Sequence, residues 1–448
     1  IVLELSRNLF AAKMLFPTTM FYYMHSDLGE WSKKNNSWDP YLKRPLSSYL
    51  KESQDNQWQV LHPQPPESPK VMFSHGGSFI RRVRGTEALL KGLLPKLETI
   101  VVSDYRMGST AAYADYILPV SLWYEKWSMM TSGMPTKPYV ILGREAVPPL
   151  YESKSDWEVF CLLGLRVAER AKERGLESFS YTAIDGRQRS FRDLARAVTC
   201  GGLYGPTDGE EVARDTFMNA TNVEKMEWED IKERGIAEIT AMGKNTRTVG
   251  NAGDIVPGEP IVTLTHHTQK KLPWPTLTRR MQFYIDHDWY LELGESLPVH
   301  KDSPKAGGDY PLQMTGGHTR WSTHSCMINQ SLLLHLQRGV PLMFMSVQDA
   351  KARGIEDGDE VAVHNDVGSF QIQAAVAPTV RPGQVVIYHG WENFQFPGWK
   401  HFKSVQASPL NPIELVSGYG HIAAVAQTGY PGHSDRDTRV EVRKVNHA

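Results

Sequence analysis

The chain has 448 residues, and its 49 lysines and arginines against 50 aspartates and glutamates give a formal net charge of −1 at pH 7. This balance argues against a nucleic-acid-binding protein, because neutralising phosphates requires a basic excess or a basic face. Hydrophobic residues (41%) and charged residues (22%) occur at globular frequencies, which excludes a disordered or collagen-like chain. The longest apolar stretch, residues 159–168, contains Arg166 and is too short to span a bilayer. The three cysteines lie far apart and predict no iron–sulfur cluster, zinc site or disulfide framework.

Length alone suggests about three domains, or two large ones. Changes of pattern along the chain divide it into four parts. We expect residues 1–69 to form a linker and part of an upstream domain, 70–200 an α/β domain, 201–309 an irregular flank and connection, and 310–448 a β-barrel domain. The first residue is Ile1, with no initiator Met or leader, so we expect the chain to be part of a larger polypeptide.

A parallel α/β sheet is predicted after the proline-rich segment 63–69. Buried strands are expected at Val71–His75, Thr99–Ser103 and Tyr116–Pro119, with a helix over Thr86–Leu94. Ligands of such sheets bind at the carboxyl ends of the strands. The loops 75–82 and 103–110 are therefore candidate binding loops.

A long helix is predicted from a capping box at Ser155–Glu158 to about Arg174. Its apolar face is expected to include Leu162, Leu165, Val167 and Ala168.

The sequence pattern changes near Pro311. From there, short runs in which apolar and polar residues alternate with period two are separated by residues typical of tight turns. Strands are expected at 360–364, 369–376, 384–388 and 438–445, with a helix near 349–353. This pattern favours a compact β-barrel over a second parallel sheet.

The densest polar segment is Thr315–Ser325, with two glycines, two histidines, an arginine and a tryptophan. Glycine and hydroxyl residues before a helix suit phosphate oxygens, and Arg320 would add a charge-assisted bond. His318 and His324 are six apart, unlike the i,i+4 spacing of paired zinc ligands on a helix, so hydrogen bonding to a heteroaromatic ligand is favoured over metal binding. A loop with satisfied histidines remains the alternative.

Three further segments leave two interpretations each. The turn 365–369 is favoured as structural over ligand-binding. The segment Tyr388–Glu392 is either a binding edge or a satisfied interior network. Ser103–Arg106 either binds a guanine or ribose edge through Asp104 or caps a helix. No dinucleotide glycine motif, P-loop or nucleophile elbow occurs.

Several motifs in the same order resemble the dimethyl-sulfoxide-reductase superfamily of molybdenum or tungsten enzymes. Val101–Thr110, Ala114–Pro119 and Trp123–Lys126 are similar to its third, Rossmann-like domain, and the C-terminal stretch is similar to its double-psi-like barrel cap. His318–Ser325, His364–Phe370, Tyr388–Glu392 and Ser417–Gly420 resemble the nitrate-reductase-like branch, which includes ethylbenzene and dimethylsulfide dehydrogenases, selenate reductase and nitrite oxidoreductase. The motif sequences at 365–370 and 389–392 are more similar to those of the ethylbenzene-dehydrogenase group than to those of nitrate reductase itself.

The resemblance implies a molybdenum bis(pyranopterin guanine dinucleotide) cofactor. His318, His324 and His389 match pterin-contacting histidines, and Asp104 matches the guanine-recognising position, whereas Ser78 stands where the family usually has Asn. The full set of expected cofactor-binding residues, with no catalytic residue or metal ligand among them, is Gly76, Ser78, Ser103, Asp104, Arg106, Ser109, Thr110, Asp115, Gly316, His318, Arg320, Trp321, His324, Ser325, Asn365, Gly368, Tyr388, His389, Trp391 and Glu392.

The resemblance also implies that this chain is the C-terminal half of a catalytic alpha subunit. The [4Fe–4S] motif and the metal-ligating aspartate are expected in an N-terminal half. Two-electron oxygen-atom transfer or hydroxylation of a small molecule is expected, with an iron–sulfur beta subunit and a haem-binding gamma subunit as electron partners and a periplasmic location. The alternatives are a cytoplasmic or membrane-associated location, a nitrate- or nitrite-converting member of the branch, and a non-catalytic half that holds the cofactor for a separate catalytic chain.

Overall fold

The structure is a computed structural model that describes residues 22–25, 28–58, 63, 66–131, 139–182, 188–240, 253–256, 258–274, 276–318, 323–407, 409–420, 422 and 437–446. The chain divides into two compact units. Described residues of the first lie within Ser103–Arg106 and Leu118–Gln282, and those of the second within Leu15–Val102, Met107–Ile117 and Phe283–Ala448. No helix in these described ranges is long and apolar enough to cross a membrane.

The first unit is a small α/β assembly. A three-stranded antiparallel sheet has the order β4-β5-β8 (Ser128–Thr131, Tyr139–Gly143, Ile236–Glu238), and β6 and β7 (Ser180–Thr182, Gln188–Ser190) pair separately. The helices are α7 (Asp156–Glu173), α8 (Phe191–Val198), α9 (Gly209–Asn219), α10 (Trp228–Arg234) and α11 (Thr265–Thr268). Apolar side chains of the sheet, α9 and α10 form its core, including Val140, Phe217 and Ile231.

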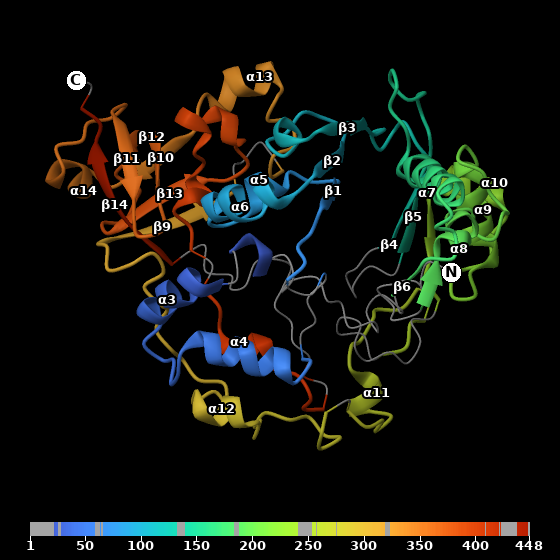
Figure 1. Cartoon of the computed structure of the whole chain (residues 1–448), viewed down its shortest axis with the longest axis horizontal. Coiled ribbons are helices and arrows are strands. Elements are labelled where there is room, and N and C mark those ends of the chain that lie inside the picture. Colours follow the sequence, from blue (N-terminus) through green and yellow to red (C-terminus); the bar gives the residue numbers. More distant parts are fainter. Residues whose placement is uncertain are drawn as a thin grey trace. The chain divides into compact units, whose positions relative to one another are not determined.

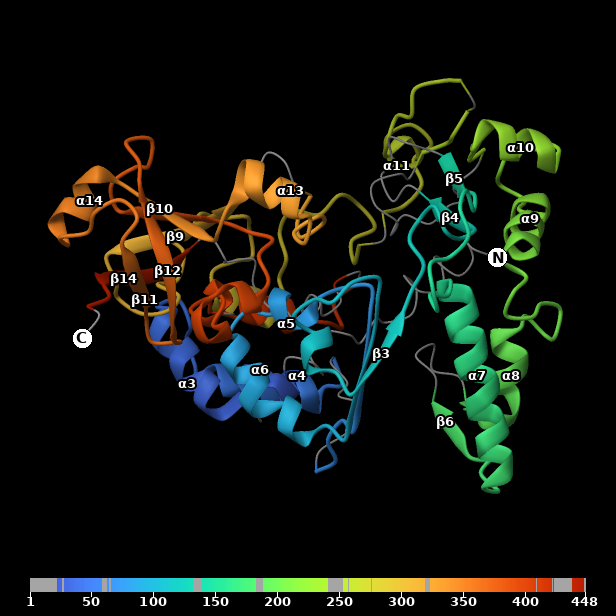
Figure 2. The same cartoon turned by 90° about the horizontal axis from the view of Figure 1, so that it is seen from above.

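Helix α7 begins as predicted but buries a different face. The Ser155 hydroxyl accepts the Glu158 backbone N–H at 3.1 Å, which confirms the cap. The predicted apolar face is wrong, because Leu162 and Val167 are 40% and 43% exposed. Small residues, including Cys161 and Gly164, are buried instead where α7 and α8 lie side by side (Figure 2). Leucines occur around much of this helix, so hydrophobicity alone does not identify the side that meets a neighbour.

The second unit contains the predicted α/β sheet. Strands β1 (Val71–His75), β2 (Thr99–Asp104) and β3 (Tyr116–Pro119) form a parallel sheet in that order, and the last residues of β2 and β3 count with the first unit. All three strands match the predictions within one residue. The connections contain α5 (Phe79–Arg82), α6 (Thr86–Gly92), η2 (Leu94–Lys96) and η3 (Ala111–Tyr113).

A helical core adjoins this sheet within the same unit. It is built from α3 (Gly29–Trp38), α4 (Leu46–Asp55), α12 (Asp288–Glu292) and the 3-10 helix η8 (Pro412–Leu415). Trp289 of α12 is almost fully buried and meets the Tyr49 ring edge-on at 4.9 Å. These elements are absent from the predictions, because their apolar residues are spread over distant parts of the sequence.

The C-terminal region is a closed six-stranded β-barrel, drawn in orange and red in Figure 1. Its order is β10-β12-β11-β14-β9-β13, with bounds Leu342–Met345, Ser369–Val376, Glu360–His364, Thr438–Lys444, Leu312–Gly317 and Gln384–Tyr388. Alternate residues such as Val361, Val363, Val385 and Ile387 fill the interior, as the period-two pattern predicts. The associated helical turns are α13 (Ser331–Leu333), the π-helix η4 (Leu334–Arg338), α14 (Val347–Ala352), η5 (Asn393–Gln395), η6 (Pro397–Trp399) and η7 (Phe402–Ser404).

The mixed α/β architecture with a barrel is thus confirmed, and β11, β12, β13 and α14 lie where predicted. Strands β9 and β10 are missing from the predictions. Thr315–Gly317 were expected in a loop, but they pair with β13 and end β9.

Candidate functional site

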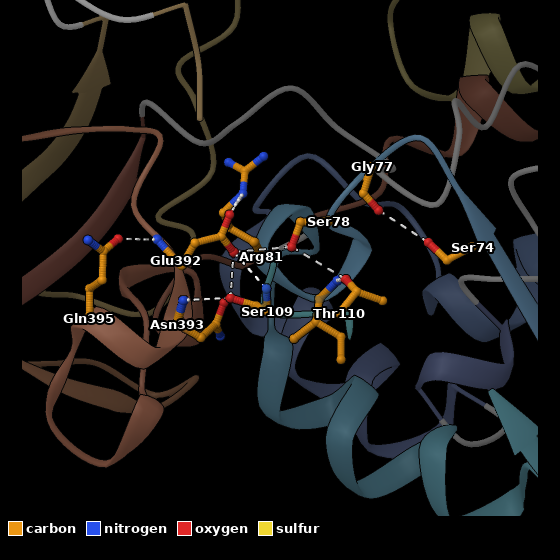
Figure 3. Close-up of polar contacts among 10 residues, drawn as sticks. Ser74, Gly77, Ser78, Arg81, Ser109, Thr110, Glu392, Asn393 and Gln395 are labelled. Atoms are coloured by element: carbon orange, nitrogen blue, oxygen red, sulfur yellow. Dashed lines mark hydrogen bonds and ion pairs between the residues drawn. The ribbon is translucent and has the colours of Figure 1, made fainter. Parts of the chain in front are cut away.

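Glu392 is the centre of a buried polar network that joins the barrel to the α/β sheet (Figure 3). It follows β13 by four residues, and its side chain is fully buried. Its carboxylate accepts hydrogen bonds from the Ser109 N–H at 2.8 Å, the Ser109 hydroxyl at 2.7 Å and the Ser78 hydroxyl at 3.3 Å. The Arg81 guanidinium lies 3.5 Å from the other carboxylate oxygen. A buried carboxylate requires such donors, because its desolvation is otherwise too costly.

Ser109 links two segments at once. Its hydroxyl donates to Glu392 and accepts the Asn393 backbone N–H at 2.7 Å. The network extends to Thr110, whose hydroxyl lies 3.4 Å from the Ser78 hydroxyl and accepts the Ile80 N–H at 2.9 Å. Residues from both loops predicted to bind ligands, Ser78 and Arg81 from one and Ser109 from the other, therefore meet the segment after β13.

For Glu392, the structure matches the interpretation as a satisfied interior network. Ser78, Ser109, Thr110 and Glu392, all predicted as cofactor-binding residues, are brought together, but their hydrogen bonds run to one another. Their contact with a cofactor stays a prediction. Arg81 and Asn393 belong to the network and were missed, because neither lies in a recognisable motif.

Three histidines converge beside the ends of two neighbouring barrel strands. His318 follows β9 and His389 follows β13, and these parallel strands place Gly317 opposite Tyr388. The rings of His318 and His389 are 4.3 Å apart between centroids, and each lies 5.0 Å from His324. One nitrogen from each ring lies within 4.8 Å of the other two. The sequence predicted all three as pterin contacts, and the structure places them together.

The position of His389 is fixed by the backbone of β9. Its Nδ1 donates to the Gly317 carbonyl at 2.6 Å, and its Nε2 lies 2.9 Å from His324 Nδ1. Burial lowers the pKa of His389, and the neighbouring His318, His324 and Lys403 act in the same direction against the bond to Gly317. The imidazole is therefore neutral at pH 7 and presents the Nε2 lone pair.

The backbone beside the three histidines adopts unfavourable dihedral angles. His324 has φ +53°, in the left-handed region, which costs a non-glycine residue about 1 kcal/mol or more. Gly390 has φ +102°, and a Cβ atom there would lie 2.1 Å from the His324 carbonyl oxygen. Glycine at 390 is thus required for the His324 segment to approach His389.

The other predicted cofactor-binding residues of the second unit differ in burial and in their hydrogen-bond partners. Asn365 uses its side chain within the protein, donating to the Val405 carbonyl at 2.7 Å and accepting from the Val367 N–H at 2.9 Å. Asp115 accepts the Ile100 N–H at 2.7 Å. The others are the buried Trp391 and Ser325, the exposed Tyr388, Gly76 with φ +66° and open space around it, Gly316 in β9, and Gly368 against the Ser404 carbonyl.

In the first unit, Ser103 is fully buried at the end of β2, and the Asp104 carboxylate accepts the Tyr105 N–H at 2.8 Å. Arg106 belongs to the same short segment. Arg320 and Trp321 lie outside the described residues. For all of these, cofactor binding stays a prediction.

The donor set around the histidines suits the edge of a heteroaromatic ligand. Neutral imidazoles offer both donors and acceptors, as ring nitrogens and carbonyls of a pterin require. Asn393 Oδ1 is buried and has no hydrogen-bond partner among the residues described, so an acceptor beside Ser109 is left for a bound donor. The residues present therefore fit a pterin dinucleotide.

The fold and the site define an α/β protein whose parallel sheet is joined to a closed β-barrel by a buried polar network. Residues 56–166 match the family described as Molybdopterin oxidoreductase, and residues 312–421 match the Molydopterin dinucleotide binding domain. The chain belongs to the molybdopterin oxidoreductases, as its motifs predicted. Both matches indicate the molybdenum bis(pterin guanine dinucleotide) cofactor.

Similar proteins are alpha subunits of respiratory and related oxidoreductases. The chain is 34% identical to the respiratory nitrate reductase subunit alpha of Haloferax mediterranei, over 96% of this chain and 44% of that protein. It is 32% identical to the dimethylsulfide dehydrogenase subunit alpha of Rhodovulum sulfidophilum, over 84% and 40%. It is 30% identical to the chlorate reductase subunit alpha of Ideonella dechloratans, over 89% and 43%. The chain thus spans less than half the length of these relatives.

A solved structure has a fold that is similar in general terms. Acetylene hydratase from Pelobacter acetylenicus aligns with a TM-score of 0.52 at 14% identity, covering 97% of this chain and 52% of that one. At this identity the likeness concerns the fold alone.

Proposed function

We propose that the chain is the cofactor-holding C-terminal part of the alpha subunit of a molybdenum-dependent oxidoreductase. The proposed reaction is two-electron oxygen-atom transfer or hydroxylation of a small molecule. Nitrate, chlorate and dimethylsulfide, which the relatives' names mention, are the first substrates to test.

One observation carries the proposal. Ser109 lies in the segment that matches molybdopterin oxidoreductases, Glu392 lies in the matched dinucleotide-binding domain, and the two share a buried hydrogen-bond network. The two matched segments are therefore joined at the loops where a parallel sheet binds its ligands.

In this proposal, residues of this chain hold and orient the cofactor. Burial lowers the pKa of His389 and keeps the ring neutral, and the proton lies on Nδ1 because the Gly317 carbonyl can only accept a hydrogen bond. His318, His324 and His389 would hydrogen-bond the pterin, and the network around Glu392 would keep the barrel cap in register with the sheet. When bound, the cofactor supplies the two-electron redox chemistry.

The finer features extend the same proposal. The sheet would be the Rossmann-like third domain of the superfamily and the barrel its double-psi-like cap. An N-terminal half carrying a [4Fe–4S] cluster, an iron–sulfur beta subunit and a haem-binding gamma subunit would be the partners, in the periplasm. These features come from the resemblance of the motifs.

The test is purification of the native complex through an affinity tag on this chain. We expect about one molybdenum and two guanine nucleotides per chain, with dye-linked turnover of at least one of the three substrates. Molybdenum without turnover of any redox substrate would support a purely structural half. Absence of both molybdenum and guanine nucleotide would contradict the proposal.

A further inference from the structure

We propose that His318, His324 and His389, the histidine cluster, bind one divalent transition-metal cation of the zinc type when no other ligand occupies their place. The inference is independent of the proposed function, because it concerns the chain without its cofactor. It adds a second ligand class to a place that the motifs associate with hydrogen bonding.

The distances permit coordination with small movements. One nitrogen from each ring already lies within 4.8 Å of the other two. Nitrogen ligands at about 2.0–2.1 Å from a tetrahedral zinc ion lie about 3.4 Å apart. The rings must therefore close by about 1.4 Å at most. The side chains of His318 and His324 are exposed, so rotation about their side-chain bonds achieves this without disturbing the barrel core.

His389 is already arranged as a metal ligand. A carbonyl oxygen only accepts hydrogen bonds, so the 2.6 Å contact with Gly317 places the proton on Nδ1 and makes Nε2 the acceptor of the 2.9 Å hydrogen bond with His324 Nδ1. A bound cation would take the place of this hydrogen bond. Metal-binding histidines commonly donate their second ring N–H to a backbone carbonyl in this way. Gly317 ends β9 beside β13, so the barrel itself fixes this ligand.

The chemistry selects the cation. Three imidazoles without a carboxylate suit zinc, copper, nickel and cobalt, whereas magnesium and calcium prefer oxygen ligands. Three protein ligands leave a fourth position for water, as in open zinc sites. Lys403 lies near enough to lower the pKa of His389, and its positive charge limits the affinity.

The test is a calorimetric Zn²⁺ titration of the full 448-residue chain, purified without metal or cofactor. His318→Ala and His324→Asn remove exposed ligands, and asparagine tolerates the left-handed backbone at 324. His300→Ala is the matched control, since His300 is an exposed histidine outside the cluster. We expect one Zn²⁺ per chain in the unmodified chain and in the control, and at least tenfold weaker binding in both cluster variants.

Cobalt substitution gives a second readout. We expect the visible absorption of tetrahedral Co²⁺ in the unmodified chain and its loss in His389→Gln, with circular dichroism checking that this variant folds. Zinc binding that is the same within twofold in His318→Ala, His324→Asn and the unmodified chain would overturn the proposal, as would equal affinity for Mg²⁺. Failure of the proposed function would instead appear as absent molybdenum in the native complex, so the two failures are distinguishable.

Discussion

The Ser109 hydroxyl donates a 2.7 Å hydrogen bond to the buried carboxylate of Glu392, 283 positions later in the chain. The Ser109 backbone N–H reaches the same carboxylate oxygen at 2.8 Å. One side chain from the barrel thus satisfies two donors from the loop after β2 (Figure 3). Because buried charges are costly without their partners, this pair couples the barrel to the sheet energetically as well as geometrically.

Removing either partner should destabilise the chain. We expect Ser109→Ala to lower the free energy of unfolding by about 1–3 kcal/mol, because the charged carboxylate of Glu392 loses the hydrogen bond from the Ser109 hydroxyl. Glu392→Gln should cost about 3 kcal/mol or more, because it removes the buried negative charge that lies 3.5 Å from the Arg81 guanidinium and places a neutral amide there. Urea unfolding measures both changes.

The matched control for these variants is Ser37→Ala, which removes an exposed hydroxyl that donates to the Lys34 carbonyl at 2.6 Å. Exposed hydrogen bonds contribute little, so we expect a change within about 0.5 kcal/mol. Equal effects of Ser37→Ala and Ser109→Ala would show that the network around Glu392 is not a stabilising junction.

Gly390→Ala should displace the His324 segment. A Cβ at 390 would lie 2.1 Å from the His324 carbonyl oxygen, a distance that no packing adjustment of a side chain relieves, because the clash is with backbone. We expect cofactor content per purified complex to fall at least tenfold. Gly383→Ala is the control, since Gly383 has φ +82° but open space around it and therefore tests backbone strain without the clash. Similar cofactor content in the two variants would argue against a role for the close approach.

The stability of the chain should depend on pH through His401. This ring is buried, and burial holds its pKa well below the ordinary value of 6.5, with Lys403 and Arg81 acting in the same direction. Between the two pKa values the unfolded chain binds the extra proton, so the contribution of His401 is fully present above about pH 6.5 and is lost as the pH falls.

His401→Gln removes this titration. We expect the slope of unfolding free energy against pH between pH 7 and 5 to decrease by up to about 1.4 kcal/mol per pH unit, the value for one proton. His300→Gln, the same substitution at an exposed histidine, serves as the matched control. Parallel slopes for the unmodified chain and His401→Gln would refute the assignment.

Sequence patterns predicted the elements whose state is decided locally. Strands β11, β12 and β13 alternate with period two between clear turn residues, so they were found within a residue. Strand β9 was missed because Thr315, Gly316 and Gly317 look like a loop, and their extended state depends on pairing with β13.

The candidate site likewise has parts that are predictable from local sequence and parts that depend on the fold. His318 and His324 are close in sequence, so their association was predictable. The meeting of His389 with both depends on the parallel register that places Tyr388 opposite Gly317. Arg81 could not be predicted as a partner of Glu392, because only the folded barrel brings that carboxylate to helix α5.

Gly164 in α7 provides a test of the corrected helix face. A Cβ there would lie 2.5 Å from Val198 Cγ1 of α8. Alanine gains about 1 kcal/mol in helix propensity over glycine, whereas overpacking costs about 1–3 kcal/mol, so we expect Gly164→Ala to be neutral to destabilising by about 2 kcal/mol. Adding Val198→Ala removes the obstructing methyl groups. The double variant should therefore be more stable than the sum of the single changes, by at least about 1 kcal/mol in a double-mutant cycle measured by thermal unfolding. Additive effects would mean that α7 and α8 do not pack through this pair.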